Sequence, residues 1–226
     1  MRVLRRLVRH RLNSALQVFV IGVLAFVSTF AMASTTNTSL DRFLIGLNTW
    51  RVHFIQRTTD SRGRSRELQK GQLLLQRPGR FRWEVSTNLD EVEPAQTMVS
   101  DGRNLWFFDR ELDQVTVRPA NTGLTATPAM LLAGAVPLRS AFTVTEMPNR
   151  EGLNWVLIEP QRNNSEFKAA HFGFSGLELR RLEIFDKLGQ KSVLLFSDIK
   201  RNINLAPEDF IFTPPDGVDV IGKPVG

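Results

Sequence analysis

The chain has 226 residues, of which 42% are hydrophobic and 23% charged, as expected for one globular domain. Its formal charge of +6 and its pI near 10.4 suggest a nucleic-acid partner. The distribution of charge excludes that class, because five arginines and no acidic residue lie within residues 1–33. The other residues hold 24 of the 29 basic side chains against 23 acidic ones, so they are close to neutral.

Residues 1–33 have the three parts of a secretory signal peptide. The five arginines precede an apolar run at 18–30, and an Ala-Met-Ala sequence at 31–33 provides a small-residue cleavage site. The pattern predicts cleavage after residue 33, with Ser34 as the mature N-terminus. The alternative is a single transmembrane anchor, but a spanning helix needs about 20 apolar residues. The sequence contains no cysteine, which excludes disulfides and a lipid-modified cysteine, so we expect a soluble periplasmic protein.

Hydrophobic periodicity next predicts one helix and one strand. We place Ser39 as the N-cap of an amphipathic helix over residues 39–48. Its apolar positions follow the spacing i, i+3, i+4 and i+7, and they are Leu40, Phe43, Leu44 and Leu47. Such a helix can cover an apolar sheet face. Over residues 50–58 the period changes to two, which indicates a strand with Trp50 on its apolar side.

The central part of the sequence predicts two hairpins. Pro78 and Gly79 have the residue types of a type II turn and separate strands at 71–77 and 81–86. In the second of these strands apolar residues alternate with charged ones, which is typical of an antiparallel strand with one face covered. The apolar residues are Phe81, Trp83 and Val85.

An Asp-Gly pair at 101–102 predicts a hairpin between strands at 97–99 and 105–108. In the second strand the alternation fails, because Leu105 and Phe107 point to one face while Trp106 and Phe108 point to the other. Both faces of the sheet are therefore apolar at this strand, and both must be covered.

The rest of the chain predicts strands with few helices. A short strand at 115–118 and a turn-rich connection at 121–127 precede a helix with Thr127 as N-cap, Pro128 at its first position and Gly134 beyond its end. A helical turn at 207–209 is a weaker prediction. Further strands are expected at 142–145, 154–159, 168–174, 179–186, 191–199 and 210–213. The fold class is thus mainly β, with about ten or eleven antiparallel strands.

A search for catalytic and cofactor motifs is negative. His53 and His171 have no metal-ligand partner at a recognisable spacing, and nucleotide, P-loop and hydrolase fingerprints are absent from the sequence. We therefore expect neither an enzyme nor a cofactor. The positive signal is apolar: 16 phenylalanines and four tryptophans occur without a tyrosine, which suits a dry pocket as well as an ordinary core.

Several stretches together resemble the bacterial outer-membrane lipoprotein carrier family LolA. They are LDRFLIGLNTWRVHFIQ, RPGRFRWEV, MVSDGRNLWFFD, TPAMLLAG and FTPPDGVDVI, in this order. The resemblance extends over nearly all of the chain after residue 38. It implies one carrier domain over 34–226, folded as an incomplete antiparallel β-barrel of about 11 strands under a short helical lid, with a cavity that takes lipoprotein acyl chains.

The resemblance also implies site residues and partners. We predict that the acyl-chain cavity is lined by Phe81, Trp83, Leu105, Phe107, Leu44, Leu47, Met130 and Leu131. Trp106 and Phe108 are the alternative if the strand has the opposite phase. Arg77, which precedes the turn proline, matches a family arginine that bonds the lid and keeps the empty form closed.

The expected partners are triacylated lipoproteins, an inner-membrane ABC transporter of the LolCDE type and an outer-membrane acceptor of the LolB type, with a monomeric carrier. The missing cysteine argues against the acceptor itself. A periplasmic lipid-binding or stress-sensing module of the same fold remains the alternative.

Overall fold

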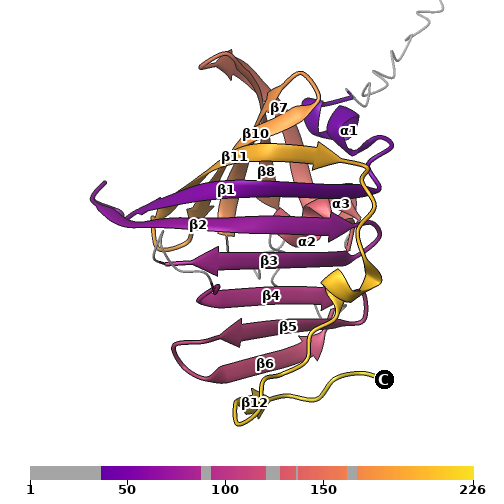
Figure 1. The fold of residues 1–226 in the computed structure, drawn as a ribbon. Coiled ribbons are helices and arrows are strands. Elements are labelled where there is room, and N and C mark those ends of the chain that lie inside the picture. Colours follow the sequence, from indigo (N-terminus) through magenta and orange to yellow (C-terminus); the bar gives the residue numbers. More distant parts are fainter. Residues whose placement is uncertain (1–36, 88–92, 121–127, 136, 162–166) are drawn as a thin grey trace, which may run out of the picture. The chain divides into compact units, whose positions relative to one another are not determined.

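A single antiparallel sheet dominates the computed structural model, which describes residues 37–87, 93–120, 128–135, 137–161 and 167–226. Twelve described strands lie in the order β12-β6-β5-β4-β3-β2-β1-β11-β10-β9-β8-β7, and Figure 1 shows most of this succession. Neighbouring strands are antiparallel, except that β12 runs parallel to β6. The two ends of the order, β12 and β7, are not paired with each other, so the sheet is open.

The strands are β1 (Thr49–Thr59), β2 (Ser65–Gln76), β3 (Arg80–Ser86), β4 (Gln96–Asp101), β5 (Asn104–Asp109), β6 (Gln114–Pro119), β7 (Phe142–Arg150), β8 (Leu153–Pro160), β9 (Phe167–Ser175), β10 (Glu178–Asp186), β11 (Lys191–Arg201) and β12 (Asp219–Ile221). The helices are α1 (Ser39–Leu44), α2 (Pro128–Leu132), α3 (Leu138–Ala141) and the 3-10 helix η1 (Pro207–Phe210). The described residues belong to one compact unit.

Turn chemistry sets the central hairpins where the sequence predicts them. Gly79 has a φ of +80° between β2 and β3, and Gly102 has a φ of +94° between β4 and β5. Asp101 supports the second turn, because its carboxylate accepts hydrogen bonds from the N–H groups of Arg103 and Asn104 at 2.7 and 2.6 Å. The bond between Arg77 and Pro78 is cis, which the type II pattern did not predict.

Helix α1 is shorter than predicted and has a different cap. Its N-cap is Thr38, whose hydroxyl accepts from the N–H of Asp41 at 3.2 Å while the Asp41 carboxylate accepts from the N–H of Thr38 at 2.9 Å. Ser39, predicted as the cap, is the first helical residue. The helix ends at Leu44, so Leu47 lies beyond it, although its side chain is buried in the core.

One other prediction is wrong, and two elements were missed. The expected strand at 210–213 is wrong, because Phe210 ends η1 and the residues after it are not in a strand. Helix α3 and the three-residue strand β12 were not predicted, and β12 raises the strand number to twelve. The predicted helices around 128–132 and 207–209 are confirmed as α2 and η1. The predicted signal peptide at 1–33 and connection at 121–127 lie outside the described residues.

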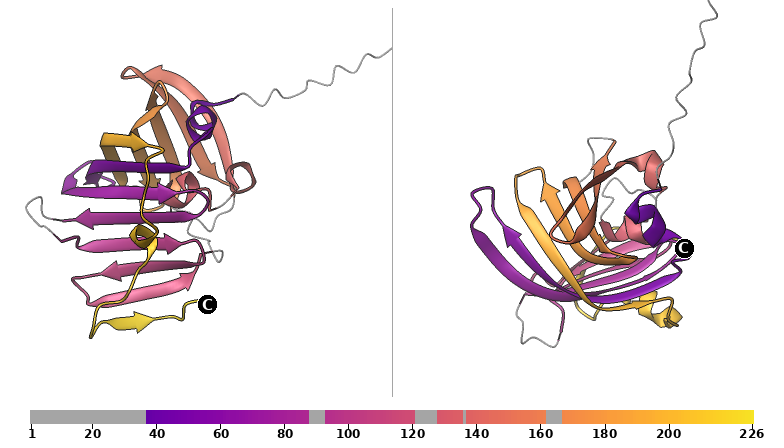
Figure 2. Two further views of the ribbon diagram at one scale, coloured as in Figure 1. Left: turned by 45° about the vertical axis from the view of Figure 1, so that its right-hand side comes forward. Right: turned by 90° about the horizontal axis from the view of Figure 1, so that it is seen from above.

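The sheet curves around the helices. The right-hand view of Figure 2 shows α1 within the curve, and we call this side the concave face and the opposite side the convex face. On the concave face α1 contacts β8 and β9, while α2 contacts β2 and β3. Across the convex face the C-terminal segment runs over β3 to β6, and its helix η1 contacts β3 and β4 (Figures 1 and 2). On β5, Leu105 and Phe108 point to opposite faces and are buried, whereas Trp106 and Phe107 are half-buried, so each face is covered in part.

Candidate functional site

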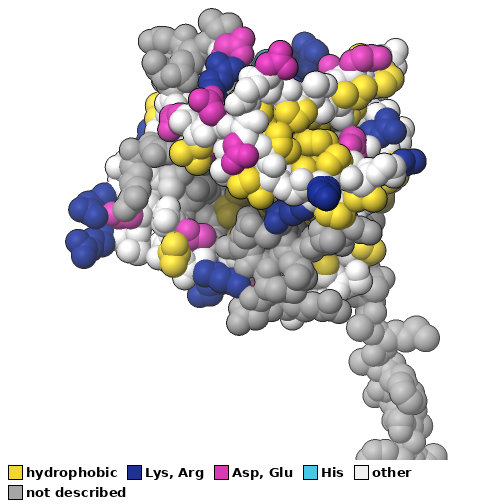
Figure 3. Space-filling model, turned by 90° about the horizontal axis from the view of Figure 1, so that it is seen from below, with side chains coloured by type: hydrophobic (Ala, Val, Ile, Leu, Met, Phe, Trp, Pro, Cys, Tyr) yellow, Lys and Arg dark blue, Asp and Glu magenta, His cyan; other side chains and the backbone are white. Residues whose placement is uncertain are grey.

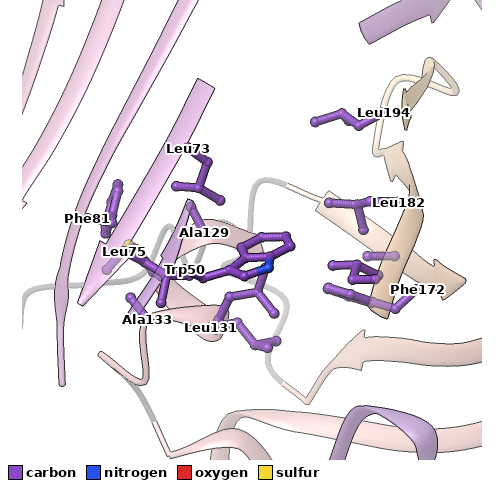
Figure 4. Close-up of a cluster of buried hydrophobic side chains, with 14 of the residues drawn as sticks. Trp50, Leu73, Leu75, Phe81, Ala129, Leu131, Ala133, Phe172, Leu182 and Leu194 are labelled. Atoms are coloured by element: carbon purple, nitrogen blue, oxygen red, sulfur yellow. The ribbon is translucent and has the colours of Figure 1, made fainter. Parts of the chain in front are cut away.

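The concave face and the helices form one continuous apolar cluster. Strands from both halves of the sheet contribute large buried side chains, as do α1, α2 and residues that follow them. Figure 4 shows part of this cluster, with Ala129, Leu131 and Ala133 from the α2 segment beside Leu75 and Phe81 of the sheet. We call α1, α2 and the residues that follow them, 45–48 and 133–135, the lid. The lid therefore shields most of the apolar face from water.

The structure brings most of the predicted cavity residues into this cluster. Phe81, Leu105, Leu47, Met130 and Leu131 are buried members of it. Two further predicted residues, Leu44 and Trp83, are partly buried and pack against it. Phe107 is half-buried and is not a member of the cluster.

Strand register shows on which face each β5 residue lies. Leu105 pairs with Ser100, which pairs with Phe81, and Phe107 pairs with Met98, which pairs with Trp83. Since paired residues share a face, the predicted set from β3 and β5 lies on the concave face. Trp106 and Phe108 lie on the other face, where their rings are 5.7 and 6.1 Å from the ring of Phe212.

The centre of the cluster is aromatic. The ring of Trp50 in β1 makes edge contacts with Phe43 of α1 and Phe196 of β11, at centroid distances of 5.5 and 5.4 Å. Trp50 is 0% exposed, yet its indole N–H has no hydrogen-bond partner among the described residues. Figure 4 shows the Trp50 ring extending into the region between Leu131 and Phe172.

Arg77 contacts both parts of the lid. Its Nη1 donates to the carbonyl of Leu44 at the end of α1, at 3.3 Å. A Cβ placed on Gly134, just after α2, would lie 2.9 Å from two nitrogens of the same guanidinium, so the glycine allows the close approach. Burial lowers the pKa of Arg77 from its usual value. The backbone of the same turn adds a contact, since the N–H of Gly79 donates to the carbonyl of Ala133 at 2.8 Å.

A second arginine, which the sequence did not reveal, binds the end of α1 more closely. Arg201 of β11 donates to the carbonyls of Phe43 and Ile45 at 2.8 and 2.6 Å. The neighbouring Asn202 donates from Nδ2 to the carbonyl of Gly46 at 2.8 Å. These carbonyls lie at a helix C-terminus, where the intrahelical partners are missing. The chain separation of more than 150 residues left no sequence signal for this arrangement.

The other end of α1 is held by carboxylates. Glu146 of β7 accepts from the N–H and the hydroxyl of Ser39 at 2.9 and 2.7 Å. Asp41 pairs with Arg139 of α3. Burial raises the pKa of Asp41, but the hydrogen bonds from Thr38 and the charge of Arg139 outweigh it and hold this pKa below its usual value. Polar side chains from β7, β11, α3 and the turn after β2 thus fix the two ends of α1.

Among the described residues, no group of three or more His, Asp or Glu side chains could hold a metal ion. His171 lies beside Glu183, which is 1% exposed and pairs with Arg150, Arg181 and Lys191 at 2.8, 2.7 and 3.2 Å. Burial lowers the pKa of His171. The cations of this cluster compensate the charge of a buried carboxylate, which is a structural role.

The outer surface gives two further facts. Among the described residues, no helix has the length and apolar character needed to cross a membrane. Figure 3 views the structure from the β12 end and shows hydrophobic side chains gathered there, beside a hollow in the surface. Val220, Ile221 and Val225 of the C-terminal segment are among the exposed apolar residues.

These features define a class of protein: an open half-barrel whose apolar concave face is closed by short helices. The family model for the outer membrane lipoprotein carrier protein LolA matches residues 46–213. The chain belongs to the LolA family.

Curated relatives are similar in sequence to most of the chain. An outer-membrane lipoprotein carrier protein from Dechloromonas aromatica is 36% identical over 214 residues, which cover 94% of this chain and 100% of that protein. Another from Methylibium petroleiphilum is 37% identical over 185 residues, 82% of this chain and 88% of that one. A solved structure of an uncharacterized conserved protein from Thermus thermophilus has a TM-score of 0.50 at 16% identity, covering 81% of this chain and 96% of that one, which is a likeness of fold alone.

Proposed function

We propose that the protein is a periplasmic carrier that shields the acyl chains of lipoproteins against its concave face. The observation that supports this most is the large apolar surface closed by a lid whose ends are fixed by polar side chains. Burying an acyl chain is favourable by about 0.8 kcal/mol per CH₂, so a chain in the aqueous periplasm needs such a surface. The role requires no chemical reaction.

The lid gives the carrier an empty closed state and a loaded open state. In the empty state the side chains of α1 and α2 cover the apolar face, and in the loaded state acyl chains replace them against sheet residues such as Phe81 and Leu105. Arg77 is proposed as a latch, because it contacts both α1 and the turn after α2. A ligand's apparent affinity decreases as the fraction of closed protein increases. The latch therefore weakens lipid binding and favours release.

The proposed partners follow from the family. The lipid-modified cargo would come from an inner-membrane ABC transporter of the LolCDE type and pass to an outer-membrane acceptor of the LolB type. The proposed processing removes residues 1–33, so that the periplasmic form begins at Ser34. An intact mass that retained residues 1–33 in a membrane fraction would instead identify a tethered protein.

Native mass spectrometry of the protein purified from its own periplasm tests the carrier role. We expect a fraction bound to triacylated polypeptides, which delipidation should remove. Co-purification of free lipid without any polypeptide, together with failure to solubilise a lipoprotein added in detergent-free buffer, would point instead to a lipid-binding module of the same fold.

A further inference from the structure

The indole N–H of Trp50 has no partner in the closed state. The residue is fully buried, and its Nε1 lies among apolar side chains without an acceptor from the described residues. Buried polar groups in folded proteins are nearly always hydrogen-bonded, and an unpaired one destabilises the state that contains it. The contrast within the chain is Trp155, which is also buried but donates from Nε1 to the carbonyl of Arg150 at 2.9 Å.

The position of Trp50 connects it to the proposed cargo. Its ring is covered by Phe43 of α1 and backed by Phe196 of the sheet, so movement of α1 would uncover it. On the strand it is paired with Leu75 on one side and with Arg201, which binds the end of α1, on the other. An apolar cargo that replaced α1 would therefore lie directly against the indole.

We propose that Trp50 is a ligand-binding donor. Its Nε1–H donates to the carbonyl of the ester or amide bond that joins an acyl chain to the rest of the lipid or lipoprotein. This inference rests on the proposed function. An acyl chain is apolar along its length, and its carbonyl is the acceptor that enters the site with it. A hydrogen bond made in the loaded state and absent from the empty one contributes to binding, and it selects acyl compounds over alkyl compounds of equal length.

A matched pair of ligands separates this hydrogen bond from hydrophobic burial. Short-chain diacylglycerol and the dialkylglycerol ether of the same chain length would compete with a fluorescent fatty-acid probe for the protein. For the wild type we expect the ester to bind more tightly by roughly 2- to 10-fold, the range of one net hydrogen bond. Trp50→Phe, which removes the N–H but keeps an aromatic ring, should bring this ratio close to one.

Trp155→Phe is the matched control, because it makes the same change at an indole that is already bonded and lies away from the lid. It should keep the wild-type ratio. An equal affinity of the wild type for ester and ether would overturn the role of Trp50 while leaving the carrier function intact. Failure of both lipids to displace the probe would remove the carrier function, and the role of Trp50 with it.

Nuclear magnetic resonance of wild-type protein with ¹⁵N-labelled tryptophan keeps the test decisive if Trp50→Phe does not fold. The Trp50 indole resonance can be assigned by elimination, with Trp→Phe variants at positions 83, 106 and 155. We expect its proton to shift downfield with the ester and not with the ether. An identical shift with the two lipids would contradict the proposed hydrogen bond.

Discussion

The two faces of the sheet are covered in different ways. On the convex face, Phe210 is buried, Phe212 packs on the rings of Trp106 and Phe108, and β12 extends the backbone ladder through β6. On the concave face the lid also buries apolar side chains, but its ends are held by side-chain hydrogen bonds. In the proposed function acyl chains replace the apolar contacts of the lid, whereas the contacts of the convex cover stay in place. We therefore expect a permanent cover on the convex face and a removable one on the concave face.

The largest expected effect is on the permanent cover. Phe210→Ala removes a buried aromatic ring and should lower the free energy of unfolding by about 3–5 kcal/mol, measured by urea denaturation. The affinity for a fatty-acid probe in the absence of urea should change little. Ile211→Ala is the control, because Ile211 is 59% exposed and its loss should cost less than about 0.5 kcal/mol. A large loss of probe affinity in folded Phe210→Ala would break the distinction between the covers.

Arg201→Leu should have the next largest effect, and it should strengthen probe binding. The substitution removes two short hydrogen bonds from a charged donor to α1, which stabilise closure by about 2–4 kcal/mol together. Weaker closure should tighten probe binding by about tenfold or more, since each 1.4 kcal/mol is a factor of ten. Uptake of lipoprotein should be kept and transfer to the acceptor should fall.

The control for this variant is Arg180→Leu, at an exposed arginine of β10 that pairs with Glu178. It should bind and transfer like the wild type. If Arg201→Leu also bound the probe with wild-type affinity, the contacts of Arg201 would belong to the fold and not to the closure of the lid.

Arg77→Leu should act in the same direction but more weakly. The residue makes one hydrogen bond of 3.3 Å to Leu44, at the long end of the range, so we expect closure to weaken by about 1 kcal/mol. Probe binding should tighten by roughly fivefold, with slower delivery to the acceptor. Equal uptake and equal delivery by wild type and variant would show that Arg77 is no latch.

The smallest expected effect is a change in probe affinity at low pH. The pKa of Asp41 is depressed in the folded protein, so the stability that it adds to α1 is present above its unfolded pKa of about 3.9 and is lost as the pH falls through the folded value. Probe binding by the wild type should therefore tighten slightly on acidification below about pH 4. Asp41→Asn should lack this change, and a parallel pH profile for the two proteins would exclude Asp41 as its source.

The sequence predicted those parts of the fold that local chemistry determines. Pro78 with Gly79, and Asp101 with Gly102, placed two hairpins correctly, and the failure of alternation at residues 105–108 predicted two covered faces. The choice of Ser39 over Thr38 as N-cap missed a local signal, because Asp41 stands three residues after Thr38 and completes a capping box with it.

The rest of the site depends on contacts that have no local signal. Arg201 ends a long strand and gives no sign in the sequence that its guanidinium reaches the carbonyls of α1. Strand β12 has three residues, too few to show a period of two, and its pairing with β6 is settled by tertiary contacts. The unpaired N–H of Trp50 likewise becomes visible only when its surroundings are known.

The open sheet has a mechanical consequence for cargo of different size. Strands β7 and β12 stand at opposite ends of the strand order and share no hydrogen bonds. A closed barrel has a circumference fixed by its ring of strand pairs, so it can widen only by breaking a ladder. Here the strands can change their mutual twist and the gap between β7 and β12 can grow while the eleven strand pairings stay intact. We therefore expect the open sheet to adapt its width to bulkier or slimmer acyl groups.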